Sequence, residues 1–264
     1  MNRERRRLVA VLLAAGYGTR LGELGRTTPK ALLTLPGTEQ QVADHLIGRI
    51  RSIPELLEVV LVTNRRFRPT LEEWAASVRD DLPVPLRVIC NGTREPDERL
   101  GAVRDLALAV QGSPGDRDFM VLATDTGYDF ALAPFVRAFR DREEADLLVP
   151  LIREDPGTLS RRGVAALDRD GYLVDFQEKP RSPRSRDTVP PLYLMRSRAV
   201  PTVQAYLREG GDPDALGSLL EWLVAAGLAR VGGWRAPGRR WDLGDPGAHD
   251  ISEPEPHGRD PEGP

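Results

Sequence analysis

Residues 8–33 read LVAVLLAAGYGTRLGELGRTTPKALL, an apolar run that leads directly into a glycine-rich loop. Gly16 and Gly18 follow the apolar run, Arg20 comes next, and Lys30 lies just beyond the loop. Glycines at the end of a strand let backbone N–H groups approach phosphate oxygens closely. The segment therefore predicts a buried strand followed by a phosphate-binding loop. The alternative is a tight turn that binds no ligand.

Two common phosphate-binding motifs do not fit this loop. A dinucleotide fingerprint has the spacing G-x-G-x-x-G, and this chain has Leu21 where the third glycine belongs. A Walker A loop has a glycine directly before its lysine, and here Pro29 precedes Lys30. If the loop binds phosphate, it does so in another way.

The chain outside this segment alternates short apolar runs with helical patterns. We expect strands at 8–14, 58–64, 85–90, 118–124 and 145–151. Apolar residues spaced three and four apart predict helices near 41–53, 67–80, 97–111 and 131–142. This alternation indicates an α/β fold, a mostly parallel sheet flanked by helices. Such sheets bind ligands beyond the carboxyl ends of their strands.

A different pattern begins near residue 160. The sequence GVAALDRDGYLVDFQEKP at 163–180 predicts a hairpin with its turn at 168–171. Helical patterns follow near 197–209 and 215–226. Residues 251–264 are rich in proline and charge, so we expect a disordered tail after one domain at 1–250.

Composition limits the class of protein. The net charge of −3 gives no reason to expect a nucleic-acid partner. Cys90 is the only cysteine, which excludes an internal disulfide framework and fits a reducing compartment. The start, MNRERRR before an apolar run, has features of a signal peptide, but we interpret it as a basic leader before a buried strand. We expect a cytoplasmic protein with no membrane span.

The long string LAAGYGTRLGELGRTTPKALL resembles the signature of the sugar-1-phosphate nucleotidylyltransferases, the family of glucose-1-phosphate thymidylyltransferases and uridylyltransferases. The resemblance implies a Rossmann-like, glycosyltransferase-A-type nucleotidyltransferase fold with a small hairpin-containing subregion that binds the sugar. It implies that Arg20 and Lys30 are catalytic, because fixed cations stabilise the charge that pyrophosphate gains as it leaves. The nucleotide-binding residues that it implies are Leu13, Ala14, Ala15, Gly16, Gly18, Thr19, Arg20, Leu100 and Gly101.

Further motifs match other parts of this family. The segment 91–106 resembles the base-recognition segment of one branch. The string DFQEKP contains Glu178 and Lys179, which the resemblance assigns to the sugar hydroxyls and to the phosphate of the sugar 1-phosphate. Lys30 and Lys179 are the only two lysines among 37 basic residues. A lysine in an arginine-rich chain indicates a place where a compact point charge is needed.

Two aspartates complete the implied site. Asp125 follows the predicted strand at 118–124, and Asp242 lies in the string RRWDLGD, which resembles the late motif of the family. The resemblance implies that this pair holds a catalytic Mg²⁺, an ion that prefers carboxylate and phosphate oxygens. It implies an NTP and a sugar 1-phosphate as substrates, bound mainly by residues 8–125 and 126–250 respectively. A homo-oligomer is also possible in this family.

The chain departs from the family pattern at two positions. Thr124 stands where the family usually has glycine before the first metal aspartate, and Pro191 stands where glycine is expected beside the sugar. Proline fixes φ and removes an N–H donor. Two alternatives therefore remain open. One is a cytidylyltransferase acting on a phosphonate or a phospho-alcohol, and the other is a nucleotide-sugar sensor without catalytic activity.

Overall fold

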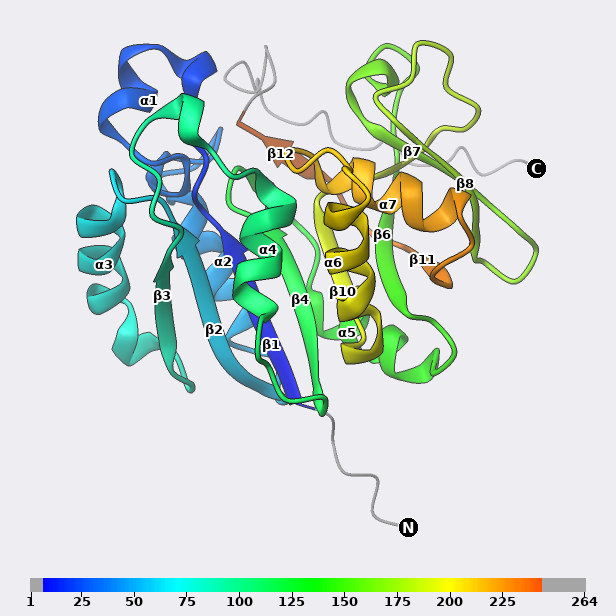
Figure 1. Ribbon diagram of the computed structural model, residues 1–264, viewed down its shortest axis with the longest axis horizontal. Helices are drawn as coiled ribbons and strands as arrows, with labels where there is room; N and C mark the ends of the chain where they lie inside the picture. The colour runs from blue at the N-terminus through cyan, green and yellow to red at the C-terminus, as the bar shows by residue number, and fades with distance from the viewer. Residues whose placement is uncertain (1–6, 244–264) are drawn as a thin grey trace, which may run out of the picture.

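The computed structural model describes residues 7–243, and a ten-stranded mixed sheet lies at their centre (Figure 1). Four parallel strands form one side of it in the order β3-β2-β1-β4. Their bounds are β1 (Arg7–Leu13), β2 (Leu56–Thr63), β3 (Leu86–Cys90) and β4 (Arg117–Ala123). The sheet is therefore parallel on the side that carries the glycine-rich loop.

The other side of the sheet is mixed. Strand β10 (Leu192–Met195) runs antiparallel to both β4 and β6 (Leu147–Arg153). Beyond β6 lie β9 (Asp187–Val189), β7 (Gly163–Leu167) and β8 (Leu173–Glu178), and β11 (Val231–Arg235) pairs with β6. A separate two-stranded sheet joins β5 (Thr126–Tyr128) to β12 (Arg240–Asp242).

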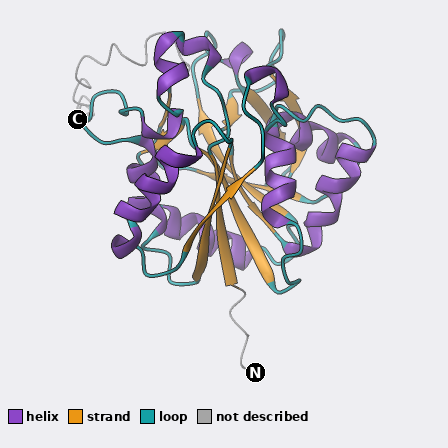
Figure 2. Ribbon diagram, turned by 60° about the vertical axis from the view of Figure 1, so that its left-hand side comes forward, coloured by secondary structure: helices purple, strands orange, loops and turns teal. Residues whose placement is uncertain are grey.

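Helices cover both faces of the large sheet (Figure 2). One face carries α2 (Val42–Ile50), α3 (Arg68–Ser77) and α5 (Leu132–Asp141), and the other carries α4 (Ala102–Val110), α6 (Val200–Arg208) and α7 (Leu216–Ala225). The short helix α1 (Glu23–Thr27) follows the glycine-rich loop. Single 3-10 turns occur at Thr19–Leu21, Lys30–Leu32, Arg79–Asp81, Pro96–Glu98, Leu159–Arg161 and Ser197–Ala199.

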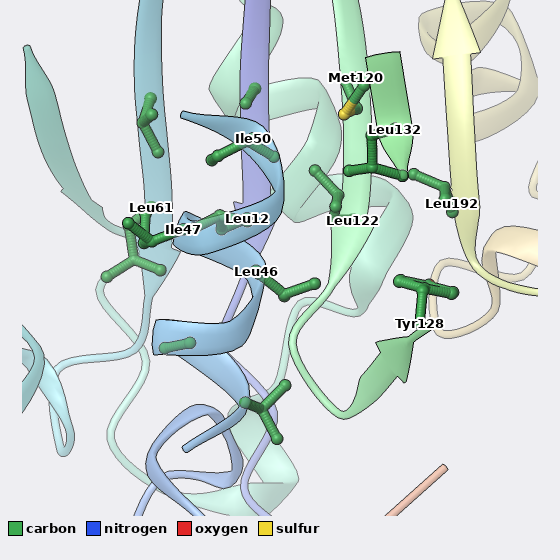
Figure 3. Close-up of a cluster of buried hydrophobic side chains, with 14 of the residues drawn as sticks. Leu12, Leu46, Ile47, Ile50, Leu61, Met120, Leu122, Tyr128, Leu132 and Leu192 are labelled. Atoms are coloured by element: carbon green, nitrogen blue, oxygen red, sulfur yellow. The ribbon is translucent and has the colours of Figure 1, made fainter. Parts of the chain in front are cut away.

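The apolar run of β1 explains why it lies in the middle. Successive side chains of a strand point to opposite faces. Leu8, Ala10 and Leu12 belong to the core beneath α2, α3 and α5, and the intervening valines belong to the core beneath α4, α6 and α7. Figure 3 shows Leu12 beside the apolar face of α2. A strand that is buried on both sides has to be apolar throughout, which accounts for its lack of alternation.

The elements expected from the sequence are largely confirmed. All five expected strands and the 163–180 hairpin are present as β1, β2, β3, β4, β6 and the β7–β8 pair. The helix expected at 97–111 was wrong at its start, because a 3-10 turn at Pro96–Glu98 and a left-handed Gly101 with φ of 91° delay α4 to Ala102. Strands β5, β9, β10, β11 and β12 were not expected.

Two expectations from the sequence concern the ends of the chain. The basic leader and the disordered tail at 251–264 lie outside the described residues. Within residues 7–243, no helix is both long and apolar enough to cross a membrane. The cytoplasmic location stays a prediction.

A buried ion pair ties the base of β4 to the segment after β10. The Asp118 carboxylate is fully buried, and its Oδ2 lies 3.2 Å from Nη1 of Arg196, which is 4% exposed. Asp118 also accepts a hydrogen bond from the Ser197 backbone N–H at 3.1 Å and pairs with Arg140. Removing one member of such a pair leaves an uncompensated buried charge.

We expect Asp118→Ala to lower the free energy of unfolding by about 3 to 5 kcal/mol, because Arg196 would lose its buried counter-ion. Urea denaturation followed by circular dichroism measures the change. Asp155→Ala is the matched control, since its carboxylate is 91% exposed and its pair with Arg186 is worth at most about 1 kcal/mol. Equal stability of the two variants would contradict the prediction.

Candidate functional site

The site lies where β1 and β4 end. The two strands run parallel with Leu13 opposite Ala123, so the chain leaves both at the same edge of the sheet. The glycine-rich loop continues from β1, and Asp125 follows β4 after one residue. The order β3-β2-β1-β4 changes direction between these two strands, which is where open α/β sheets bind ligands.

The glycine-rich loop has its shape because helix α1 packs against it. Gly18 is left-handed with φ of 62°. A Cβ on Gly25 of α1 would lie 2.1 Å from the Gly18 carbonyl oxygen, so only glycine fits there. A Cβ on Gly18 would in turn lie 3.6 Å from Cγ of Lys30, which places the lysine directly against the loop.

Lys30 and Asp125 meet at this edge. The Lys30 Nζ donates a hydrogen bond to Asp125 Oδ2 at 2.9 Å. Both side chains are partly open, with 26% of Lys30 and 33% of Asp125 exposed. A cation that follows the glycine-rich loop and a carboxylate that follows β4 are therefore in direct contact.

The structure places Asp242 beside Asp125, although the two are far apart in sequence. Asp242 of β12 is the register partner of Thr126, the residue after Asp125. The Leu243 N–H donates to the Asp125 carbonyl oxygen at 3.0 Å. Oδ2 of Asp242 lies 3.1 Å from Nη1 of Arg162. Each aspartate thus carries a cationic partner, and both line one cavity.

A first cavity of about 440 Å³ extends from the loop to the start of α4. All of the residues expected to bind the nucleotide line it: Leu13, Ala14, Ala15, Gly16, Gly18, Thr19, Arg20, Leu100 and Gly101. Lys30 and Asp125 lie on its border with a second cavity. These residues therefore line one cavity together. Leu100 and Gly101 come from the segment before α4, and the others come from the end of β1 and the glycine-rich loop.

The second cavity, of about 530 Å³, lies between the hairpin and α7. Glu178, Lys179, Asp125 and Asp242 line it, and Arg20 and Lys30 border both cavities. The structure therefore brings the residues expected to bind the sugar phosphate to the same place as the two aspartates. Two cavities that share a charged border suit two substrates that react with each other.

The end of β8 places Glu178 and Lys179 with little freedom. A Cβ on Gly217 would lie 1.8 Å from Glu178 Oε2, so α7 leaves room for that carboxylate only because residue 217 is glycine. Burial raises the pKa of Glu178, and the nearby Lys179 acts in the opposite direction. Lys179 has φ of 48°, the only positive φ at a non-glycine residue in the described part of the chain. Such strained residues concentrate at functional sites.

Thr124 and Pro191, the two departures from the family pattern, both make hydrogen bonds that involve the main chain. The Thr124 hydroxyl donates to the Leu13 carbonyl at 2.9 Å, which ties the end of β4 to the end of β1. Pro191 lines the second cavity, and its carbonyl accepts the Ala123 N–H at 3.1 Å. Thr124 therefore does not disrupt the ends of β1 and β4, whereas Pro191 forms part of the wall of the second cavity.

Sequence reasoning missed an arginine cluster in the second cavity. Arg240 donates to Glu154 Oε1 at 2.9 Å, and Arg162 contacts Glu154 Oε2 at 3.3 Å. Burial opposes ionisation, but the two arginines hold the pKa of Glu154 below its usual value. The Nη2 of Arg240 is buried and has no hydrogen-bond partner among the described residues. Arg240 lies two residues before Asp242 in the quoted motif, but nothing in the sequence marks Arg162.

Sequence reasoning also named the segment 91–106 without singling out Asp105. Asp105 is 5% exposed and lines the first cavity from α4. Asn91 donates to its Oδ1 at 2.8 Å. No pattern in the sequence indicated a buried carboxylate at this position, because a charged residue on a helix usually faces solvent.

Comparison with known proteins places the chain among nucleotide-transferring proteins. The chain is 31% identical over 176 residues to the mannose-1-phosphate guanylyltransferase catalytic subunit beta of Drosophila pseudoobscura pseudoobscura, a match that covers 65% of this chain and 43% of that protein. It is 28% identical to the CMP-5'-(3-aminopropyl)phosphonate synthase of Streptomyces rubellomurinus, covering 93% of this chain and 37% of the relative. The chain thus spans less than half the length of each of these two relatives.

Solved structures share the fold. A structure described as a glucose-1-phosphate thymidylyltransferase of Bacillus anthracis matches with a TM-score of 0.72 and 19% identity, covering 94% of this chain and 98% of that one. The model of the nucleotidyl transferase family matches residues 9–236. That match includes every residue that lines the first cavity and all but Arg240 and Asp242 of those that line the second, and the chain belongs to the nucleotidyl transferase family.

Proposed function

We propose that the protein transfers a nucleotidyl group from a nucleoside triphosphate to a sugar 1-phosphate, which gives a nucleotide-sugar and pyrophosphate. The observation that carries this proposal is that Lys30 and Asp125 lie in contact on the border between the two cavities, with Asp242 beside them in the second cavity. A triphosphate in the first cavity and a sugar phosphate in the second would meet at that border. An oxygen of the sugar phosphate attacks the α-phosphorus in line, and the bond from the α-phosphorus to the bridging oxygen breaks.

In this reaction the cationic side chains position the phosphates and neutralise their charge. Phosphoryl and nucleotidyl transfers depend on positioning and charge neutralisation more than on proton transfer. Arg20 is exposed beside the loop and offsets charge on the triphosphate. Lys30 lies where the leaving pyrophosphate gains charge, so it stabilises the transition state more than the ground state. Lys179 holds the attacking phosphate, and Glu178 orients the sugar hydroxyls.

The two aspartates fit Mg²⁺. The described residues contain no group of three or more histidine, cysteine or acidic side chains that suits a metal ion. Mg²⁺ needs no such group, because it commonly binds one or two carboxylates together with substrate phosphates. Asp125, directly before β5, and Asp242, on the paired strand β12, supply two carboxylates to the second cavity. Bound there, the ion would neutralise charge on the phosphate oxygens.

A second candidate keeps the nucleotidyl transfer and changes the acceptor to a phosphonate. Two observations favour it. Pro191 replaces the expected glycine in the wall of the second cavity, and the match to the Streptomyces phosphonate synthase covers 93% of this chain. Pyrophosphate release from each common triphosphate, crossed with sugar 1-phosphates and aminoalkyl phosphonates, separates the two candidates. Nucleotide binding without release under any condition would instead indicate a sensor.

We expect Asp125→Asn and Asp242→Asn each to lower the rate of pyrophosphate release by several orders of magnitude, because each removes a carboxylate from the proposed metal site. EDTA should stop release by the wild-type protein, and excess MgCl₂ should restore it. A coupled phosphate assay measures the rates, and circular dichroism checks the fold. Asp155→Asn, at an exposed carboxylate, is the control. A near-wild-type rate for either site variant would remove the metal assignment.

We expect Gly217→Ala to raise the KM for the acceptor at least about tenfold, with little change in the KM for the triphosphate. The new methyl group would lie 1.8 Å from Glu178 Oε2 and displace that carboxylate. Gly48→Ala is the matched control, because a Cβ there meets no atom within 4 Å and alanine suits a helix. Steady-state kinetics with each substrate varied in turn measures both constants. An unchanged acceptor KM would exclude Glu178 from acceptor binding.

A further inference from the structure

The first cavity has two chemically different ends. One end holds the glycine-rich loop, Arg20 and Lys30, which suit phosphates. The other end is formed by the start of α4, with Leu100, Gly101 and Asp105 in its wall. Since a nucleobase is neutral and flat, it fits the end that is away from Arg20 and Lys30. This placement rests on the function proposed above.

Asp105 is the unpaired charge at the base end. Its only hydrogen bond to a described side chain is the one that Oδ1 accepts from Asn91 at 2.8 Å. Oδ2 makes no hydrogen bond or ion pair with residues 7–243, although Asp105 is only 5% exposed. The other charges lining this end, Arg99 and Asp214, pair with each other at 2.8 Å. Asp105 is therefore a mostly buried side chain that lines the cavity and has one carboxylate oxygen able to accept a hydrogen bond from a ligand.

A chain of buried hydrogen bonds fixes the direction of this carboxylate. The Tyr17 hydroxyl donates to Thr93 Oγ1 at 2.8 Å, and the Thr93 hydroxyl donates to Asn91 Oδ1 at 2.9 Å. The Thr93 backbone N–H donates to the same Asn91 oxygen at 3.1 Å. The oxygen of the Asn91 amide is therefore occupied, so its NH₂ group has to face Asp105. Oδ1 is held by this donor, and Oδ2 is left for the cavity.

We propose that Asp105 is a specificity-determining residue that accepts a hydrogen bond from an amino group on the nucleobase, so that the cavity selects cytosine, adenine or guanine over uracil and thymine. Carboxylates accept hydrogen bonds from base amino groups. Uracil and thymine present a ring N–H between two carbonyl oxygens. A carboxylate repels these carbonyl oxygens. A site built to hydrogen-bond one group discriminates strongly against analogues that lack it.

Burial disfavours the ionised form of the Asp105 carboxylate. Burial raises the pKa of Asp105 to about 6, and the Asn91 hydrogen bond opposes that shift. Between the ordinary pKa of an aspartate and this raised value, the native protein binds more protons than the unfolded chain. The contribution of Asp105 to stability therefore falls as the pH rises through this window. The ionised group is a cost to the ligand-free protein at neutral pH.

We expect Asp105→Asn to melt at a higher temperature than the wild-type protein at pH 8, because it removes the cost of a buried charge. The gap should narrow as the pH falls toward 4, where Asp105 of the native protein is protonated and carries no buried charge. Differential scanning fluorimetry across this pH range measures the shift, and it shows that the variant folds. A lower melting temperature at pH 8 would contradict the assigned burial cost.

Isothermal titration calorimetry with MgCl₂ present tests the base preference. CTP is compared with UTP, and ATP and GTP are each compared with ITP, which lacks the amino group of GTP and has a carbonyl oxygen in place of the amino group of ATP. We expect the amino-bearing member of at least one pair to bind at least fivefold more tightly to the wild-type protein. In Asp105→Asn, Asn91 holds the new carbonyl oxygen, so an NH₂ group faces the cavity. The preference should then fall at least fivefold or reverse. Asp116→Asn, at an exposed turn, should retain the wild-type preference.

Three outcomes would each overturn the inference. The first is a smaller difference in affinity within every pair, the second is an unchanged preference in Asp105→Asn, and the third is no measurable binding of any triphosphate. Binding is measured without turnover, so the result is independent of catalysis. A clear amino preference without pyrophosphate release would refute only the proposed function. Release without any amino preference would refute only the role of Asp105.

Discussion

The parallel pairing of β1 with β4 is the constraint on which the site depends. It aligns Leu13 with Ala123, so the glycine-rich loop and Asp125 leave the sheet side by side. The 2.9 Å contact between Lys30 and Asp125 is the direct result. Both strands are buried on their two faces, and their hydrogen-bonded register allows little relative movement. The charged groups at the cavity border are therefore held by the core of the protein.

Close backbone approaches shape both cavities. Gly25 lets α1 lie on the glycine-rich loop, and Gly217 lets α7 lie against Glu178. In each case a single methyl group would occupy space that another atom already fills. The charged residues around the border are also paired, with Lys30 on Asp125 and Arg162 on Asp242. The cations at this border are therefore already in position before any ligand binds.

The long patterned segments were predictable, and the short ones were not. The apolar runs at 8–14 and 118–124 predict β1 and β4, because strands that are buried on both faces must be apolar throughout. Strands β5 and β12 are only three residues long, which is too short for any periodicity to show. Their pairing nevertheless places Asp242 beside Asp125. The arginine cluster around Glu154 and the buried Asp105 were missed for a related reason, since their surroundings come from distant parts of the chain.

The sequence by itself determined the alternation of strands and helices, the glycine-rich loop and some of the charged residues that line the cavities, among them Lys30, Asp125 and Glu178. These features are local, because apolar periodicity and glycine geometry act over a few neighbouring residues. Only the tertiary structure decided that Asp242 lies beside Asp125, that Gly217 makes room for Glu178 and that Asp105 is a mostly buried carboxylate in the wall of a cavity. These features depend on packing between segments distant in sequence, and burial and hydrogen bonding there have no signature along the chain.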